Sequence, residues 1–422
     1  MQISYVSSLL HNSQVSKYHE THDKSNIKAA KVSVSIITSH IRPSRCGTIA
    51  FVCIVAFIFT IFFHKKENMA HLFEPLTVRG ITLRNRIGVS PMCMYSYSDG
   101  FSNDWQVIHL GARAAGGAGL VISEATAVEP RGRITPFDVG LWSDAHIESL
   151  ARMTRVVKSN GAVAGVQLAH AGRKASTARP WENGKPILPD NPQGWSVIGP
   201  SPLAFNEEFS IPHELSLAEI KEVQESFRLA TRRALAAGFE WLELHAAHGY
   251  LIHSFYSPLS NQRTDQYGES FENRIRFLLE TVQTVRLEWP EHLPLTVRIS
   301  GTDWVDGGWS MTDSVELARR LKAEGVDLID CSSGGNAAQA KIPVGPGYQV
   351  PISEAVKRGA NILTATVGLI TDPLQADEII RNGQADVVLL GREMLRNPYW
   401  ALHAAQALKQ AASVPPQYLR AF

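Results

Sequence analysis

Short apolar, β-branched runs alternate with longer helical patterns from Met69 onward, and this alternation constrains the fold more than any other feature. A helical stretch lies between most of the runs. The stretch from Ser216 to Ala237, for example, opens with a capping box formed by Ser216 and Glu219 and stops at Gly238. Eight strand–helix units with apolar strands predict an α/β fold, a closed parallel (β/α)8 TIM barrel. The eight runs are residues 87–90, 120–123, 162–167, 241–244, 295–299, 328–330, 362–365 and 387–390.

Polar side chains gather where these runs stop. In a (β/α)8 barrel the carboxyl ends of all strands share one face, so side chains far apart in the sequence can meet in one pocket. The sequence therefore predicts a polar pocket at that face. The residues that close or follow the runs are Cys93, Glu124, Gln167, His245, His248, Arg298 and Arg392.

Two imidazoles and a phenol follow the fourth run. His245 and His248 can both donate hydrogen bonds to one oxygen, and Tyr250 can deliver a proton nearby. Such a set can polarise a carbonyl group and protonate a carbon. An isolated HxxH sequence is more often a histidine pair satisfied within a loop, but the convergence of the strand ends favours the functional interpretation. A zinc site needs a third ligand and usually a glutamate beside the first histidine on a helix; neither is evident, so no metal is predicted.

Glycines follow the last two runs, where this kind of barrel usually binds phosphate. Gly368 follows the seventh run, and Gly391 and Arg392 follow the eighth. Backbone N–H groups and a helix N-terminus form such a cradle, and the two positions together favour a phosphate over simple tight turns. A GxGxxG dinucleotide loop after a strand is absent. The glycine-rich residues 111–119 precede a strand instead and indicate a helix end and a turn.

The first 68 residues differ in character from this body. Residues 1–45 are polar with little periodicity and are expected to be disordered. Residues 46–63 carry no charge and approach the minimum length for crossing a bilayer as a helix, which predicts a membrane anchor and a cytosolic catalytic domain. The alternative is a gene-model extension, with translation starting at Met69 and a cytoplasmic protein. A cleaved signal peptide fits poorly, because no small-residue cleavage site follows the apolar run.

Composition excludes several classes of protein. The formal net charge of the 422 residues is +1, so no electrostatic attraction to nucleic acid is indicated. The four cysteines form no CxxC pair and no cluster, which argues against a disulfide framework and an iron–sulfur centre.

Four motifs stand in order along the barrel: SPMCMYS at residues 90–96, QLAHAGRK at 167–174, HAAHGYL at 245–251 and GREMLR at 391–396. Together they resemble the old yellow enzyme family of FMN-dependent ene-reductases, most closely its thermophilic-like branch. The resemblance covers residues 69–422, which are expected to form one FMN-binding oxidoreductase domain.

The resemblance implies which residues bind FMN. The Cys93 thiol would lie near the flavin ring and tune its redox potential. Gln167 would hydrogen-bond the pyrimidine part of the ring, and Arg298 would stabilise the negative charge of the reduced flavin. The other residues assigned to the flavin or its phosphate are Ser90, Pro91, Met92, Ala125, Lys174, Gly368, Gly391 and Arg392.

The same resemblance implies the substrate contacts. His245 and His248 would bind the oxygen of the substrate's electron-withdrawing group, and Tyr250 would protonate the α-carbon after hydride transfer. Tyr95 would be a second phenol touching the substrate. Arg420 matches a terminal arginine that reaches the neighbouring subunit's site in this branch, which implies a homodimer. The branch often ends in Gly-Trp, whereas this chain ends in Ala421-Phe422.

The activity implied is a ping-pong reduction of the C=C bond of an activated alkene, namely an enone, enal, maleimide or nitro compound, with NADPH or NADH as hydride donor. A related flavin barrel, such as a dienoyl-CoA reductase or a trimethylamine dehydrogenase, is the first alternative. A phosphate-binding isomerase or aldolase is a second, although neither a Schiff-base lysine nor a metal site stands out. A membrane-tethered protein that holds FMN without turnover is a third.

Overall fold

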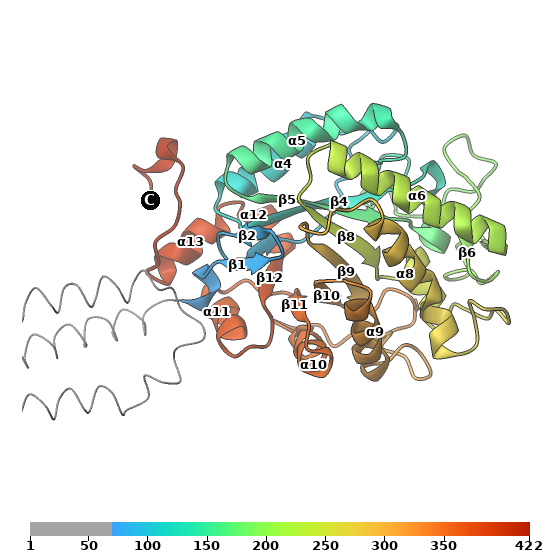
Figure 1. Cartoon of the computed structure of the whole chain (residues 1–422). Coiled ribbons are helices and arrows are strands. Elements are labelled where there is room, and N and C mark those ends of the chain that lie inside the picture. Colours follow the sequence, from blue (N-terminus) through green and yellow to red (C-terminus); the bar gives the residue numbers. More distant parts are fainter. Residues whose placement is uncertain (1–69) are drawn as a thin grey trace, which may run out of the picture. The chain divides into compact units, whose positions relative to one another are not determined.

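Eight parallel strands close into a barrel in the computed structural model, which describes residues 70–422 (Figure 1). The strands follow one another around the barrel in chain order, and the last pairs with the first where Leu389 lies beside Gly88. The predicted barrel is confirmed. The strands are β3 (Ile87–Val89), β4 (Leu120–Ala127), β5 (Val163–Ala169), β8 (Trp241–Ala246), β9 (Leu295–Ser300), β10 (Leu328–Ser332), β11 (Leu363–Thr366) and β12 (Val387–Leu390).

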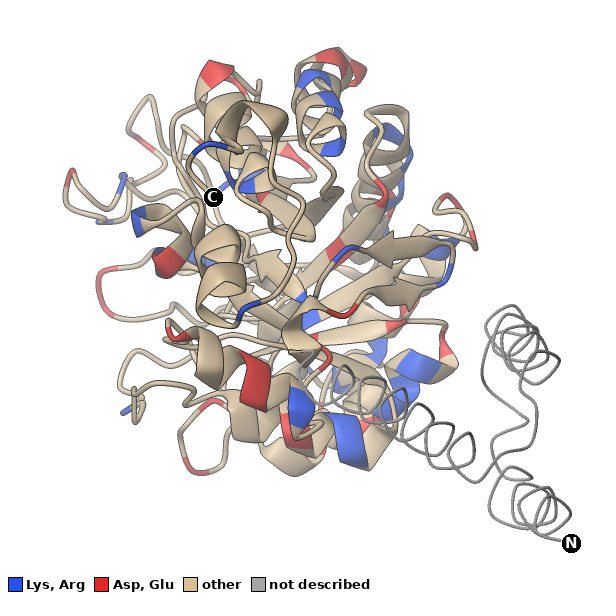
Figure 2. Ribbon diagram, turned by 90° about the vertical axis from the view of Figure 1, so that its left-hand side faces the viewer, with Lys and Arg blue, Asp and Glu red and all other residues tan. Residues whose placement is uncertain are grey.

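Helices lie outside the barrel, and Lys, Arg, Asp and Glu residues are intermixed on them (Figure 2). The capping box of Ser216 and Glu219 starts α6 as the sequence predicts, and residues 111–119 end a helix and form a turn. The longer helices are α4 (Asp104–Ala115), α5 (Ile147–Ser159), α6 (Leu217–Ala236), α8 (Phe271–Arg286), α9 (Met311–Ala323), α10 (Val350–Ala360), α11 (Pro373–Arg381) and α13 (Trp400–Ala407).

Short elements complete the fold. Among them, α7 (Leu251–Tyr256) and α12 (Arg392–Arg396) each begin close behind a barrel strand. The short strands form the hairpin of β1 (Leu76–Val78) and β2 (Ile81–Leu83), and a small sheet of β6 (Ile198–Gly199) and β7 (His213–Glu214). The 3-10 helices of the described residues are His71–Phe73, Pro130–Gly132, Asp144–His146, Gly172–Lys174 and Pro416–Tyr418.

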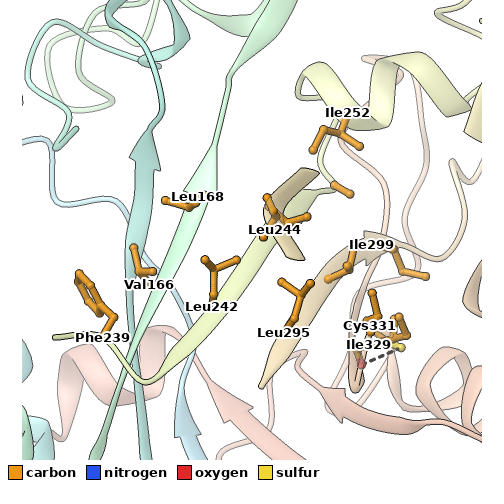
Figure 3. Packing of buried hydrophobic residues seen from close by; sticks show 14 of the residues in the cluster. Val166, Leu168, Phe239, Leu242, Leu244, Ile252, Leu295, Ile299, Ile329 and Cys331 are labelled. Atoms are coloured by element: carbon orange, nitrogen blue, oxygen red, sulfur yellow. Dashed lines mark hydrogen bonds between the residues drawn. The ribbon is translucent and has the colours of Figure 1, made fainter. Parts of the chain in front are cut away.

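The two faces of each barrel strand carry different side chains. Val166 and Leu168 of β5 pack beside Leu242 and Leu244 of β8 in the main hydrophobic core, which includes residues of the outer helices (Figure 3). The alternate residues form a second, smaller apolar cluster, to which Trp241 belongs. Because side chains alternate along a strand, the same faces then present Gln167, Glu243 and other polar groups nearer the strands' carboxyl ends. The fold thus places an apolar layer next to a polar one inside the barrel.

The predictions for the N-terminal segment lie outside the described residues: these are the disordered stretch 1–45 and the membrane segment 46–63. Within residues 70–422, none of the helices combines the length and the apolar character needed to cross a membrane. The described residues, 70–422, belong to one compact unit.

Candidate active site

The end of β8 and the loop behind it bring three aromatic rings together. The ring centroids of His245 and His248 lie 5.1 Å apart with the planes at 89°, and the Tyr250 ring lies 4.9 Å from His245. The alternation of β8 turns His245 into the barrel, and the tight turn that follows returns His248 and Tyr250 to the same place. The two imidazoles and the phenol of the HxxHxY spacing therefore share one site.

Both histidines are neutral at physiological pH. Burial lowers the pKa of each well below its usual 6.5, and the nearby Arg298 guanidinium lowers both further. His245 Nδ1 accepts a hydrogen bond from the backbone N–H of Ala247 at 3.3 Å, so the proton of the neutral ring is on Nε2. His248 Nε2 lies 2.7 Å from Ser332 Oγ.

The backbone at His248 adopts the left-handed conformation, with φ of +61°. Its N–H donates to Ser300 Oγ at 3.0 Å, and its carbonyl accepts from Lys174 Nζ at 2.9 Å. A positive φ at a non-glycine residue persists only where surrounding contacts enforce it, and such strain gathers at functional sites. Ser300 and Lys174 thus hold the second histidine in position.

The next peptide is anchored by a third histidine that the sequence motifs do not single out. His253 Nδ1 accepts from the Gly249 N–H at 2.9 Å, while its Nε2 lies 3.1 Å from Asp303 Oδ1. Both side chains are fully buried, and Asp303 also accepts hydrogen bonds from Ser257 and Trp309. The only sequence signal for this support is a histidine early in the helix that follows the motif.

Two glycines let the loops behind β8 and β10 pack backbone against backbone. Gly249 and Gly335 both have positive φ, +74° and +84°, and a Cβ at Gly249 would lie 2.4 Å from the Gly335 carbonyl oxygen. Lys174 spans the contact, because its ammonium donates to the carbonyls of His248 at 2.9 Å and Gly335 at 2.7 Å. No side chain fits between these two loops.

We expect Gly249→Ala to destabilise the protein by about 2–4 kcal/mol, since it combines an unfavourable φ with a steric overlap. The matched control is Gly383→Ala, where φ is +68° but nothing lies within 4 Å of an added Cβ. That variant measures the φ penalty alone, about 1–2 kcal/mol. The unfolding free energies come from urea titration. Equal losses for the two variants would show that the contact with Gly335 does not constrain the loop.

Lys174 has protein partners on every side. Its ammonium lies 4.4 Å from the ring centroid of Phe205 and 5.5 Å from that of Tyr250. Burial, with a smaller contribution from Arg173, lowers its pKa to about 8. The contacts of Lys174 tie the site loops together, and its predicted position beside the flavin stays a prediction.

The segment behind β3 lies against the same rings. Cys93, Tyr95 and Tyr250 pack around a small apolar cluster that includes Ala171 and Val197. Burial raises the pKa of the Cys93 thiol, and the nearby carboxylates of Asp138 and Glu124 raise it further; burial also raises the pKa of both phenols. At neutral pH these three groups therefore carry their protons.

Glu124 fixes the course of this segment. Its carboxylate accepts a hydrogen bond from the Met94 N–H at 2.7 Å and another from the Tyr97 hydroxyl. Glu124 stands at the register shift in β4, between Ser123 and Ala125. Burial raises its pKa to about 8. The predicted flavin residue Ala125 is buried directly after this shift.

An open cavity of about 200 Å³ lies behind β10, β11 and β12. The residues predicted to hold phosphate, Gly368, Gly391 and Arg392, line it together with Arg298. The loop behind β10 adds Gln349, whose Nε2 donates to the Val367 carbonyl at 2.9 Å. The sequence reasoning missed the contribution of this loop, because it contains no spacing motif. Among the polar lining residues that the sequence did not indicate are Ser332, Tyr348 and Gln349.

The chemistry of this cavity fits FMN. Arg298 and Arg392 supply positive charge for a phosphate or a reduced flavin, and Ser332 and Gln349 supply hydrogen-bonding groups. A Cβ at Gly391 would meet only Met92 Sδ, at 3.8 Å, so the cradle is open at this point. The residues present therefore suit a phosphate-bearing cofactor with polar and apolar parts.

Arg298 connects the cavity to the β3 segment. Its Nη1 donates to Ser90 Oγ at 3.2 Å, and the Ser90 N–H donates to the Leu390 carbonyl at 3.0 Å. Pro91 and Met92 continue this segment, half-buried. The predicted flavin residues of the first motif and of the fifth strand thus lie together.

Gln167 and Arg420 are two of the predicted residues that do not line this cavity. Gln167 is buried inside the barrel and donates to Glu243 Oε1 at 2.8 Å. Arg420 is exposed behind the short 3-10 helix Pro416–Tyr418 and does not line the cavity of its own chain. Its contact with a neighbouring subunit stays a prediction.

Comparison with known proteins identifies the family of the chain. Residues 71–411 match the NADH:flavin oxidoreductase / NADH oxidase family. The NADPH dehydrogenase of Geobacillus sp. (strain WCH70) is 49% identical over 351 residues, which are 83% of this chain and 98% of that protein. The NADPH dehydrogenase of Bacillus subtilis (strain 168) is 47% identical over 351 residues, with the same two coverages.

A solved structure agrees with the sequence comparisons. Morphinone reductase superposes with a TM-score of 0.68 at 26% identity, covering 82% of this chain and 92% of that one. The predicted family and its flavin and nicotinamide cofactors are confirmed by these matches. The chain is an oxidoreductase that belongs to the NADH:flavin oxidoreductase / NADH oxidase family.

Proposed function

We propose that this chain is an FMN-dependent NADPH dehydrogenase that reduces the C=C bond of activated alkenes by a ping-pong mechanism. The observation that carries the proposal is the meeting of two neutral imidazoles and a protonated phenol: the ring centroids of His248 and Tyr250 lie 5.1 Å and 4.9 Å from that of His245. The phosphate-type cavity that shares Arg298 and Ser332 with this group supports it. The names of the similar dehydrogenases favour NADPH over NADH as the donor.

Different residues would hold the phosphate and the ring system of FMN. Arg392, Gly391 and Gly368 would bind its phosphate, and Arg298 would face the ring system. Gln167, Ala125 and the segment from Ser90 to Cys93 would line the ring. Bound there, FMN supplies the hydride that reduces the alkene.

The two histidines would bind the oxygen of the substrate's electron-withdrawing group. His245 presents Nε2–H, because its Nδ1 accepts the Ala247 N–H. The Ser332 hydroxyl lies 2.7 Å from His248 Nε2 and 3.3 Å from Gln349 Oε1. When it donates to the nearer acceptor, His248 Nε2, the proton of that ring is on Nδ1, and His248 also has one N–H to offer. Two neutral donors in a buried site stabilise the negative charge that develops on the oxygen.

The phenol of Tyr250 would complete the reaction by protonating the α-carbon. Its ring lies against His245, so the proton donor is next to the oxygen-binding pair. Tyr95, which packs in the same cluster, would contact the substrate. The substrate classes that suit this arrangement are enones, enals, maleimides and nitro compounds.

A direct test uses residues 69–422. We expect the purified protein to bind FMN, to turn yellow and to oxidise NADPH when cyclohexenone is added. Arg392→Ala should weaken FMN binding by about 10- to 100-fold, since it removes a charge-assisted phosphate contact. The control is Arg358→Ala, an exposed arginine on α10 paired with Glu354.

Colourless protein that gains no absorbance with added FMN would contradict the proposal. Protein that binds FMN and consumes no NADPH would indicate a flavin-binding protein without turnover. FMN reduction without alkene reduction would restrict the proposal to its first half-reaction.

A further inference from the structure

Four polar side chains form a layer inside the barrel, next to the candidate site. They come from adjacent strands: Gln167 from β5, Glu243 from β8, Arg298 from β9 and Asp330 from β10. In the strand register Gln167 lies beside Glu243, and Arg298 lies beside Asp330. Each is at most 5% exposed.

The side of this layer that faces the apolar cluster is dry, whereas Arg298 on its other side lines the open cavity. Glu243 borders the apolar cluster of the barrel interior, and water has no hydrogen-bonding partners among those side chains. The residues of that border are Leu120, Ile122, Trp241, Leu328, Ala365, Val387 and Leu389. Charges in the polar layer must therefore be balanced by the layer's own members.

The hydrogen bonds of the layer are incomplete when both acids are ionised. Gln167 Nε2 donates to Glu243 Oε1 at 2.8 Å, and Arg298 Nε lies 3.2 Å from Asp330 Oδ2. With two ionised acids, neither oxygen of Asp330 has a hydrogen-bond donor of suitable geometry, although both are buried. Two carboxylates and one guanidinium would also leave a net negative charge among buried side chains, which is costly.

We propose that Glu243 retains its proton in the folded protein and uses it to donate a hydrogen bond to the Asp330 carboxylate. Asp330 alone then carries the negative charge that faces Arg298. One proton on Glu243 then removes both problems, the missing hydrogen-bond donor for Asp330 and the excess negative charge of the layer. The Glu243 hydroxyl supplies the missing donor to Asp330, while its carbonyl oxygen still accepts from Gln167. The layer becomes neutral overall, and Glu243 acts as a positioning residue for Gln167 and, through Asp330, for Arg298.

The proposal fixes the sign of a pH effect. Burial, reinforced by the Asp330 carboxylate, raises the pKa of Glu243 well above its ordinary value, while Arg298 opposes this shift. These two are the charged groups that face it, and Gln167 is uncharged. The unfolded chain releases the Glu243 proton above about pH 4.3, whereas the folded chain retains it. Wild-type stability should therefore fall as pH rises from the unfolded pKa toward the folded pKa.

Glu243→Gln tests this sign without requiring flavin. The amide can donate to Asp330 and accept from Gln167 as the protonated acid does, but it does not titrate. Above pH 5, the folding equilibrium constant of the variant should gain on that of wild type by about tenfold per pH unit. Urea unfolding at several pH values measures this gain. Parallel stability profiles for the two proteins would overturn the proposal.

Infrared spectroscopy tests for the proton directly and needs only wild type and folded variants. We expect a carboxylic acid C=O band at neutral pH that shifts in D2O and is missing from Glu243→Gln. Glu124, whose pKa burial raises to about 8, should contribute its own band. The matched variant Glu124→Gln should remove that second band and leave the first. An unchanged acid band in Glu243→Gln would also overturn the proposal.

The proposed charge arrangement also affects the midpoint potential of bound FMN. This effect rests on the proposed function and is measured separately from the unfolding and infrared tests. Asp330→Asn removes the negative charge beside Arg298, which should favour reduced flavin by about tenfold, or about 30 mV for a two-electron couple. Glu243→Gln should leave the midpoint potential of bound FMN unchanged, since a neutral group replaces a neutral group. A rise in both variants would show that Glu243 is ionised. A chain that binds no FMN would refute the proposed function and leave the unfolding and infrared tests intact.

Discussion

Tyr250→Phe is expected to slow alkene reduction by about 10²- to 10⁴-fold while FMN reduction by NADPH stays near the wild-type rate. The variant removes one oxygen atom and keeps the ring that packs against His245, 4.9 Å away. Burial, followed by the influence of the nearby Cys93 and Asp138 side chains, raises the pKa of this phenol, so Tyr250 holds a proton to donate across the neutral range. Only the half-reaction that consumes this proton should suffer.

Stopped-flow measurement of the two half-reactions separates these effects. Tyr399→Phe is the matched control, because the Tyr399 hydroxyl contacts the Tyr418 hydroxyl at the surface, at 3.2 Å, and does not line the cavity. Equal slowing of both half-reactions in Tyr250→Phe would point to a structural role. Full retention of alkene reduction would identify another proton donor, and Tyr95, in the same cluster, would be the first to replace.

The barrel was predictable because each of its strands and helices has a signal in a short stretch of consecutive residues. Each strand appears in the sequence as a short apolar run, and the capping box of Ser216 and Glu219 marks the start of α6 within four residues. The prediction was least accurate at the end of β4, which continues to Ala127 through a register shift. A shift of this kind depends on the pairing with β5, which no run of residues on β4 alone can show.

The site was predictable where its residues share a motif or stand at the end of an apolar run. His245, His248 and Tyr250 belong to one short stretch, so their spacing already indicated that they share a site. Their supports come from other strands and become neighbours only when the barrel closes. Ser300 ends β9 and Ser332 ends β10, and neither belongs to a recognisable pattern.

The role of Glu243 could not be predicted from the sequence either. It lies in the apolar run 241–244, directly before the HAAHGYL motif. Its proposed role nevertheless depends on Asp330 and Arg298, which come from two other strands. An alternating strand pattern predicts that a polar group faces inward, but it does not predict whether that group is protonated. That property follows from burial and from the charges around it, which only the folded chain brings together.

His245→Ala is expected to lower kcat/KM for the alkene by about 10²- to 10³-fold, the usual effect of removing one donor from a developing oxyanion. The reason is geometric and electrostatic. Burial keeps the ring neutral and the Ala247 N–H occupies Nδ1, so the single proton of His245 is committed to Nε2. No side chain of β8 can replace that donor, because the next inward residue toward the amino end of the strand is Glu243.

Binding of a phenol such as p-hydroxybenzaldehyde reports on the same donor without turnover, and it should weaken in His245→Ala while FMN stays bound. The matched control is His403→Ala on the outer helix α13, where the imidazole is exposed and contacts Asn397. Ser332→Ala should give a smaller loss in phenol binding, since it leaves His248 in place and frees its tautomer. If His245→Ala bound the phenol as tightly as His403→Ala, the oxygen of the substrate would have to be held elsewhere. The pairing of the two histidines would then be a feature of loop packing alone.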